Sequence, residues 1–593
     1  MDWDLTSYFS DFHSPTYTAY KNELEEKISD LSERVESLLG SEMATVNDWE
    51  AMLIDYELMH SSLSHISSYI GCLVSAEAQN EAYLKEEAAL ADIQASIAKL
   101  ADKIMRGIGA MEDTLFGEFI QRDRLDGAQF WLQETREQSQ KRMPAEMEEL
   151  AADLGVNGIS SWSRLYFSTM GNMKFRYNDP ETGEQLVPVS QRNSLLSNPN
   201  RERRKAVLDG ANETFEQNQQ TFTSALNAIS GTRHTLNRKR NIDSFLHPSL
   251  KQSRIQQTTL EALMQAIENR IDFGRSVFSF RSKVLGIDDP GYADLHAPLT
   301  LEGGGPTWKE GVDLVSTAFN TVYPAMGVFF DEVINKQWVD YTPRDGKRPG
   351  GFCTGSLATR ESRIFMTYKD TLSDVLTLAH EAGHAWHSRL LKDQRVFAAR
   401  YPMTIAESAS TFAERILTEG VLASDAYDDN TKLVLLDADV NHMLSFLLDL
   451  PVRFRFEEEL YRLRANGTLS ASEICNLMSS TQRRIFGDSL APDGEDPWFW
   501  ASKLHFYIEG VQFYNYPYTF GYLLSTAFMN RFRDSAEEAL NAFERYLRNS
   551  GKMSCEDVVQ DTLGEDISDP NFWANLIDGL DRTFQMYKDL LAR

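Results

Sequence analysis

Residues 371–387 read TLSDVLTLAHEAGHAWH, and this stretch has the features of a helix that carries metal ligands. Thr371 stands three residues before Asp374, which is the spacing of an N-terminal capping box. The apolar residues that follow recur at helical spacing, namely Leu372, Val375, Leu376 and Ala379. We therefore predict that a helix begins at this box and that positions 380 and 384 share one of its faces.

That face contains an HExxH motif, formed by His380, Glu381 and His384. On a helix the motif places two imidazoles one turn apart with a carboxylate beside them, which is the arrangement of a zinc site with its own general base. A buried helix with two hydrogen-bonded histidines is the simpler alternative. It does not explain Glu381, because an unpaired carboxylate on a largely apolar segment would be costly. We predict that His387, two turns beyond His380, is a packing residue or a partner of a metal ligand rather than a ligand itself.

A hydrolytic zinc ion usually has three protein ligands and one open position for water. Glu407 is the best candidate for the third ligand, because small residues follow it and would let two helices approach closely. The 22 residues between His384 and Glu407 allow one helix to end and the next to begin. Glu414, two turns further on, is either a partner of a metal ligand or a solvated acid. We expect one zinc ion per chain.

Four separated blocks of the chain resemble the oligoendopeptidase F family of thimet oligopeptidase-like zinc metallopeptidases, which carry an HExGH motif. The blocks are residues 338–352 (WVDYTPRDGKRPGGF), 362–387, 406–414 (AESASTFAE) and 505–528. The resemblance implies that His380, His384 and Glu407 bind zinc and that Glu381 is the catalytic carboxylate. It also implies a mainly α, two-lobed helical zincin-type metallopeptidase. Such a fold would have a deep substrate channel and a small β element next to the HExxH helix.

The block at 505–528 is rich in aromatic residues, and it includes Tyr507, Tyr514, Tyr516, Tyr518 and Tyr522. Most of these tyrosines are expected to pack in the core, as buried tyrosines usually do. In the resembling family a Gly-Tyr pair places a phenol over the zinc, and Gly521 and Tyr522 match that pair. The resemblance therefore implies that Tyr522 acts at the catalytic site, with Tyr514 and His505 as further candidates. The spacing of the histidine and tyrosine residues ahead of Gly521 differs from their spacing in the thimet branch of the family.

Residues 363–368 are mostly strand-forming residues whose side chains fall into two sets with a period of two, as the two faces of a strand would. We therefore predict a strand just ahead of the helix. We expect it to be an edge strand that pairs with an extended peptide. In the resembling family, the corresponding strand and the glycine-rich turn before it hold the peptide backbone. Here the turn is residues 350–355 (GGFCTG), which differs from the commonest form in that family.

The N-terminal region is predicted to be helical, because it has no proline between Pro15 and Pro144. A short heptad pattern precedes Gly40, and it consists of Leu24, Ile28, Leu31, Val35 and Leu38. Two heptads are too few for a long coiled coil, so we expect a helical hairpin or the edge of a bundle. Residues 173–189 contain the turn sequence NDPETG and predict a β-hairpin. We therefore expect a helical N-terminal domain at 1–198 and a catalytic zinc-peptidase domain at 199–593.

The composition argues against several classes of partner. The 59 basic and 88 acidic residues give a net charge of −29, which does not suit a nucleic-acid-binding protein. No apolar run approaches the ~18 residues needed to span a membrane, so no membrane association is expected. The first residues lack the features of a secretory signal, and the four cysteines are scattered. We therefore expect reduced thiols and a cytoplasmic location.

These observations predict a zinc-dependent oligoendopeptidase that hydrolyses internal peptide bonds of short unfolded peptides in cytoplasmic peptide turnover. Its expected partners are oligopeptide substrates, and the sequence leaves the oligomeric state open. One alternative is a zinc exopeptidase, either a carboxypeptidase or an aminopeptidase; Gly109 to Asp113 resemble an aminopeptidase element but lie far ahead of the HExxH motif. The other alternative is a non-catalytic helical peptide-binding protein with a structural metal, which would have no need of Glu381.

Overall fold

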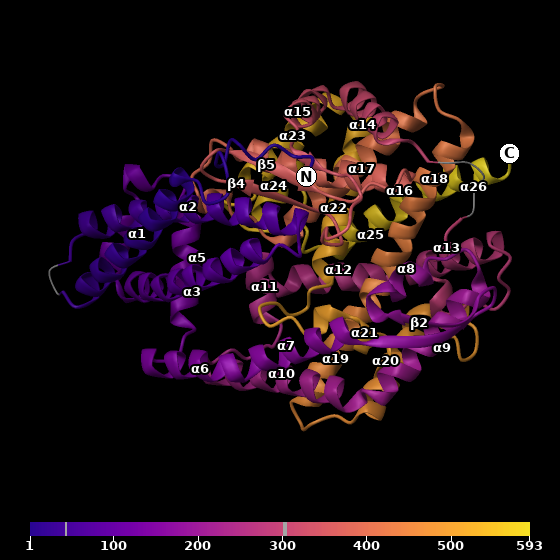
Figure 1. Ribbon diagram of the computed structural model, residues 1–593, viewed down its shortest axis with the longest axis horizontal. Coiled ribbons are helices and arrows are strands. Elements are labelled where there is room, and N and C mark those ends of the chain that lie inside the picture. The colour runs from indigo at the N-terminus through magenta and orange to yellow at the C-terminus, as the bar shows by residue number, and fades with distance from the viewer. Residues whose placement is uncertain (42–43, 300–304) are drawn as a thin grey trace. The chain divides into compact units, whose positions relative to one another are not determined.

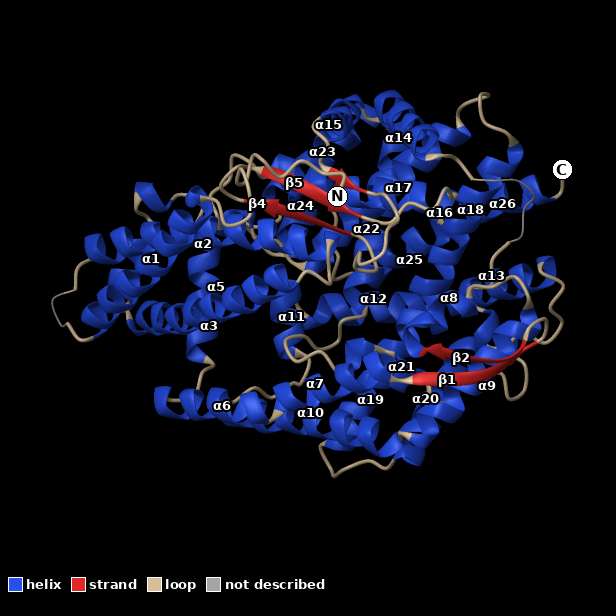
Figure 2. Cartoon of the chain, viewed as in Figure 1, coloured by secondary structure: helices blue, strands red, loops and turns tan. Residues whose placement is uncertain are grey.

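The computed structural model describes residues 1–41, 44–299 and 305–593, and it is mostly helical with two small sheets (Figure 1, Figure 2). The chain divides into two compact units, each assembled from three segments. The first unit comprises Met1–Lys141, Gly304–Asp428 and Leu524–Glu565, and the second comprises Arg142–Gly303, Asp429–Leu523 and Asp566–Arg593. The predicted mainly α fold with a small β element beside the HExxH helix is confirmed. The predicted linear division between residues 198 and 199 stays a prediction.

The first unit contains the HExxH helix and the N-terminal helices. Its helices are α1 (Pro15–Leu39), α2 (Val46–Ala76), α3 (Glu81–Ala110), α4 (Asp113–Ile120), α5 (Gln129–Gln140), α14 (Trp308–Val322), α15 (Pro324–Asn335), α16 (Leu372–Leu390), α17 (Met403–Leu422), α23 (Ala536–Asn549) and α24 (Cys555–Leu563). Its strands are β3 (Val339–Asp340), β4 (Phe352–Ser356) and β5 (Glu361–Phe365).

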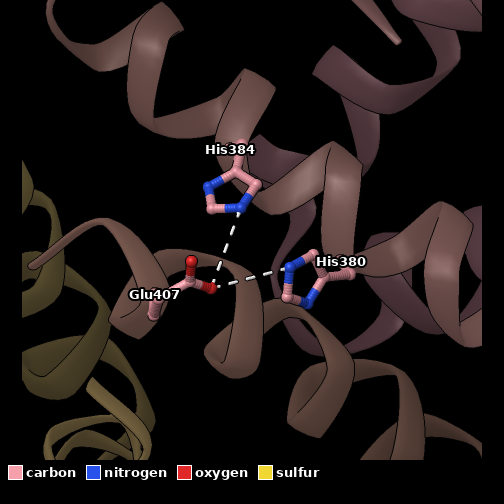
Figure 3. Close-up of side chains that lie close together, drawn as sticks. All are labelled: His380, His384 and Glu407. Atoms are coloured by element: carbon pink, nitrogen blue, oxygen red, sulfur yellow. Dashed lines mark ion pairs between the residues drawn. The ribbon is translucent and has the colours of Figure 1, made fainter. Parts of the chain in front are cut away.

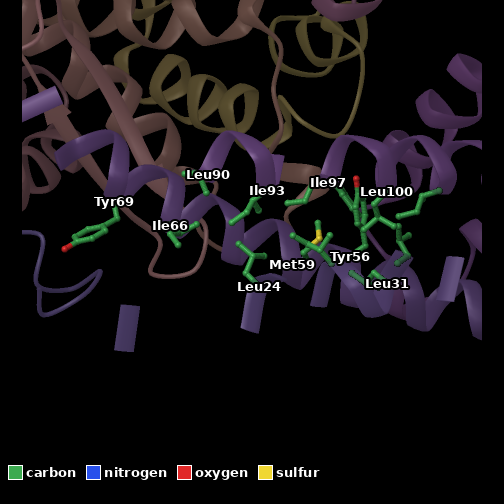
Figure 4. Close-up of a cluster of buried hydrophobic side chains, with 14 of the residues drawn as sticks. Leu24, Leu31, Tyr56, Met59, Ile66, Tyr69, Leu90, Ile93, Ile97 and Leu100 are labelled. Carbon is green, nitrogen blue, oxygen red and sulfur yellow. The ribbon is translucent and has the colours of Figure 1, made fainter. Parts of the chain in front are cut away.

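The N-terminal helices form a bundle with its own apolar core, as the heptad pattern predicts. The α1 helix starts at the N-cap Ser14, ends before Gly40 and packs against α2 and α3. Figure 4 shows the side chains that meet between these helices; those labelled are Leu24, Leu31, Tyr56, Met59, Ile66, Tyr69, Leu90, Ile93, Ile97 and Leu100. The same core includes Phe365 of β5, so the bundle supports the sheet that precedes α16.

The sheet of the first unit has the order β3-β5-β4. The predicted strand is present as β5, but the expectation that it lies at an edge is wrong. Parallel β3 pairs with one side of β5 and antiparallel β4 with the other, because the turn at 357–360 folds the glycine-rich segment back onto it. The edge strands are therefore β3 and β4, and the residues of β4 belong to the segment predicted to form a turn.

The second unit is also helical and contains the predicted hairpin, β1 (Lys174–Asp179) with β2 (Gly183–Pro188), which pair antiparallel. Its helices are α6 (Ala145–Asn157), α7 (Ile159–Asn172), α8 (Arg192–Leu196), α9 (Arg201–Gln217), α10 (Gln219–Lys239), α11 (His247–Ser253), α12 (Gln257–Asn269), α13 (Ile271–Val284), α18 (Asp429–Leu444), α19 (Leu450–Arg464), α20 (Ala471–Phe486), α21 (Phe499–Ser502), α25 (Pro570–Gly579) and α26 (Asp581–Leu591). A further helix, α22 (Tyr516–Asp534), contributes residues to both units. Among the helices of residues 1–41, 44–299 and 305–593, none has the length and apolarity to cross a bilayer.

The α16 and α17 helices touch along their backbones at Gly383. The predicted capping box is present at the start of α16, since the Thr371 hydroxyl accepts from the backbone N–H of Asp374 at 3.2 Å. A Cβ atom at Gly383 would lie 2.6 Å from the Ala409 carbonyl oxygen and 2.7 Å from the Ser410 Cα atom. Only glycine fits there, and the small residues predicted after Glu407 form the opposite surface.

We expect that Gly383→Ala lowers the free energy of unfolding by about 1–3 kcal/mol, because the added methyl group displaces backbone atoms of α17. Gly71→Ala is the matched control. Gly71 lies inside α2 with nothing within 4 Å of an added Cβ atom, so that substitution should stabilise the protein by about 0.5–1 kcal/mol. Urea denaturation of both variants measures the difference. Equal stability of the two would contradict the close contact.

Candidate functional site

The two histidines of α16 and Glu407 of α17 converge on one point (Figure 3). The Glu407 Oε2 atom lies 3.7 Å from His380 Nε2 and 4.0 Å from His384 Nε2. One ligand atom from each residue can be chosen so that all three lie within 4.8 Å of one another. The structure therefore brings together the three side chains that the sequence singles out as metal ligands.

The donor atoms of this triad fit a zinc ion. Nitrogen and oxygen ligands bound tetrahedrally at about 2.0–2.1 Å from zinc lie roughly 3.3–3.5 Å from each other. The observed separations of 3.7 and 4.0 Å exceed this spacing by only a few tenths of an ångström. Two imidazoles and one carboxylate also match a hydrolytic zinc site with one open position.

Glu414 is a buried partner of His380 rather than a solvated acid. Its side chain belongs to a residue that is only 7% exposed, and its Oε1 atom lies 2.6 Å from His380 Nδ1. Because an ionised carboxylate can only accept, Nδ1–H donates and Nε2 is left to face Glu407. The Ser410 hydroxyl in turn donates to Glu407 Oε2 at 3.1 Å. Each of these two ligands thus has a neighbour on α17 that orients it.

Glu381 lies beside the triad with its carboxylate unengaged. The residue is 6% exposed, and within the described chain no hydrogen bond or ion pair holds its side chain. An added Cβ atom on Gly351, the residue directly before β4, would lie 3.3 Å from Glu381 Oε1. Burial raises the pKa of Glu381 to about 7. The negative charges of Glu407 and Glu414 also raise this pKa, whereas His380 lowers it. The carboxylate is therefore available to accept a proton from water.

The electrostatics of the cluster favour a cation. Burial by itself would lower the pKa of His380. The hydrogen bond to Glu414 and the negative charges of Glu414, Glu407 and Glu381 outweigh the effect of burial and raise this pKa to about 9. Burial and the neighbouring His380 hold the pKa of His384 well below its ordinary value. A proton on His380 therefore offsets only part of the charge of the three carboxylates, and a metal ion at the triad would replace it.

His387 packs in the interior, as predicted. Its ring is fully buried and stacks on Tyr401 with 3.9 Å between ring centroids. Its Nε2 atom lies 2.9 Å from the Ser550 hydroxyl and 3.3 Å from the Leu547 carbonyl oxygen. This histidine therefore anchors α16 to the end of α23.

The three predicted site residues of the aromatic block belong to the second unit. Tyr522 is buried and stacks on Phe446 at 4.5 Å between ring centroids. His505 and Tyr514 lie together, with their rings 5.5 Å apart. Burial, together with neighbouring cationic side chains, lowers the pKa of His505 to about 4. Their roles in catalysis stay predictions.

Sequence reasoning left Glu414 undecided and did not identify Ser410 or Gly351. The spacing of seven residues between Glu407 and Glu414 places both on one face of α17, but this spacing alone fits either role of Glu414. The approach of Gly351 to Glu381 had no signal in the sequence, because it depends on how β4 folds back beside α16.

The chain is similar to known peptidases in sequence and in fold. Residues 295–576 match Peptidase family M3, and residues 108–175 match Oligopeptidase F. The plasmid oligoendopeptidase F of Lactococcus lactis subsp. cremoris is 26% identical over 421 residues, which cover 69% of this chain and 67% of the relative. The fold is similar to that of a Chlamydophila abortus protein described as a peptidase, with a TM-score of 0.83, 19% identity and coverage of 99% and 98%. It is also similar to oligoendopeptidase-F from Enterococcus faecium, with a TM-score of 0.71, 18% identity and coverage of 97% and 100%.

We expect that Glu414→Gln weakens zinc binding by about 10- to 100-fold, because the neutral amide no longer strengthens the His380 imidazole as a ligand. Competition with a chromophoric chelator measures the affinity. Glu50→Gln is the control, since Glu50 is a buried carboxylate of the same unit that pairs with Arg122. An unchanged zinc affinity in Glu414→Gln would contradict this role.

Proposed function

Because the chain is a member of peptidase family M3, we propose that it is a zinc-dependent endopeptidase that hydrolyses internal bonds of short unfolded peptides. The observation that carries the proposal is the convergence of His380, His384 and Glu407 beside the unengaged carboxylate of Glu381. A structural metal site would close all four positions with protein ligands and would have no need of a free carboxylate.

In the proposed mechanism, His380, His384 and Glu407 would hold a zinc ion, and the bound ion would supply Lewis acidity to the scissile carbonyl and to a water molecule. Glu381 accepts the proton of the attacking water and then delivers it to the departing amine. Glu414 keeps the His380 ring in place through the hydrogen bond to Nδ1, and Ser410 does the same for Glu407.

The developing oxyanion requires a further hydrogen-bond donor. We assign this role to Tyr522, with Tyr514 and His505 as further candidates, on the strength of the Gly521-Tyr522 pair. All three side chains belong to the second unit.

The substrate would bind as an added strand. The edge strand β4 begins directly after Gly351, which lies beside Glu381. An extended peptide paired along β4 is therefore bound through its main chain, a mode that suits peptides of varied sequence. The names of the relatives, oligoendopeptidase F and oligopeptidase PepF, support oligopeptides as substrates. The four cysteines are not joined in disulfides, which is consistent with a role in cytoplasmic peptide turnover.

We expect the wild-type protein to cut a ten-residue peptide that is blocked at both ends, because an endopeptidase needs neither terminus. Mass spectrometry identifies the internal fragments. Glu381→Gln should retain zinc but lose about 10²- to 10⁴-fold of the turnover, because it removes the proton acceptor. An intact blocked peptide with zinc bound to the wild-type protein would favour an exopeptidase or a peptide-binding protein instead.

A further inference from the structure

A cavity of about 170 Å³ lies in the first unit, where β4 ends. Its walls come from α2, from the turn that joins β4 to β5, from the last turns of α16 and from the segment before α17. The polar side chains that line it are those of Ser64, Ser356, Arg360, Glu361, Ser362, Ser388 and Tyr401. The cavity wall thus contains hydroxyl groups, one guanidinium and one carboxylate.

The Arg360 guanidinium has no counter-ion in the described part of the chain. Its side chain makes no ion pair or hydrogen bond there, and the acid whose charge acts on it is the exposed Asp393. Glu361 also lines the cavity, but its Oε2 atom accepts from the Ser7 hydroxyl at 2.5 Å and from Arg363 at 3.1 Å. Among the described residues that line the cavity, Arg360 is therefore a cation without an ion pair, whereas the carboxylate of Glu361 is paired with Arg363.

Arg360 also stands at a position where glycine would be the easier residue. Its φ angle is 57°, in the left-handed region, at the last position of the turn between β4 and β5. Glycine adopts that conformation without the steric cost that a side chain brings. An arginine there places a half-buried positive charge at the cavity wall.

The cavity lies on the same side of α16 as the metal triad. The Ser388 hydroxyl donates to the carbonyl of His384 at 3.1 Å, and Tyr401 is hydrogen-bonded to Ser388. Seven residues of helix between Glu381 and Ser388 correspond to about 10 Å. The five residues of β4 that follow Gly351 correspond to about 16 Å of strand. An extended peptide would cover that distance in roughly three to five residues.

We propose that this cavity binds a carboxylate of the peptide substrate, held by Arg360 at three to five residues from the scissile bond. The carboxylate is either the C-terminal α-carboxylate or the side chain of an acidic residue. Since this subsite rests on the proposed endopeptidase function, it determines which peptides that same site prefers. A peptide amine is excluded as the occupant, because the guanidinium would repel it.

Two series of one parent peptide distinguish the two sources of the carboxylate. In the first series the C-terminus, three to five residues from the cleaved bond, is a free acid or an amide. In the second series both ends of the peptide are blocked, and one residue that lies three to five positions before or after the cleaved bond is either Glu or Gln. The values of kcat and KM are measured with wild-type protein, Arg360→Gly and Lys392→Gln. Lys392 is exposed next to the lining residue Leu391, so its substitution removes an equal charge outside the cavity.

We expect the wild-type protein to prefer the charged member of one series by about tenfold through a lower KM, as a charge-assisted hydrogen bond would give. The Arg360→Gly variant should lose that preference, since glycine readily adopts the left-handed backbone conformation at this position. The Lys392→Gln variant should keep the preference. Equal cleavage of charged and neutral peptides by the wild type would overturn the proposed subsite but not the proposed endopeptidase function. A preference that survives in Arg360→Gly would lead to the same conclusion. Failure of the wild type to cut any peptide would overturn both proposals.

Discussion

The approach of α17 to α16 at Gly383 sets the geometry on which the site depends. A helix can place two histidines on one face by its own periodicity, but it cannot supply a third ligand from the opposite side of the ion. That ligand requires a second helix at a separation where a short carboxylate reaches the imidazoles. Backbone atoms of Ala409 and Ser410 lie less than 3 Å from the position of a Cβ atom on Gly383, so the two helices are in direct backbone contact there. At this separation the Glu407 carboxylate lies within 4.0 Å of both imidazoles.

The charges around the triad explain why the same helices hold so many buried polar groups. Glu381, Glu407 and Glu414 are all buried near two imidazoles, and isolated carboxylates in such surroundings would be costly. Each has a separate task in the proposed site, namely proton transfer, metal binding and orientation of His380. A cation at the triad offsets their mutual repulsion. Binding of a metal ion at this cluster would therefore stabilise the folded protein.

Much of this arrangement could be predicted from local sequence. The capping box at Thr371, the HExxH motif and the small residues after Glu407 each reflect interactions within a few turns of helix, so their spacing is visible in the chain. The place of β5 in the centre of the sheet could not be predicted in this way, because it depends on pairing with the distant β3 and on a turn that folds β4 back. The role of Glu414 needed the packing of α17 to be known, since its spacing alone fits both a partner of His380 and a solvated acid. Arg360 has no motif, and its importance becomes apparent only from the cavity beside it.

The central claim is that α16 and α17 together hold one metal ion with an open position beside Glu381. Diffraction at the zinc absorption edge from crystals of the zinc-loaded protein tests it most directly. The account predicts a single anomalous peak about 2.0–2.2 Å from the Nε2 atoms of His380 and His384 and from an oxygen of Glu407, with no fourth protein ligand. A peak at another place, a site without Glu407, or a fourth side chain that closes the coordination would contradict it.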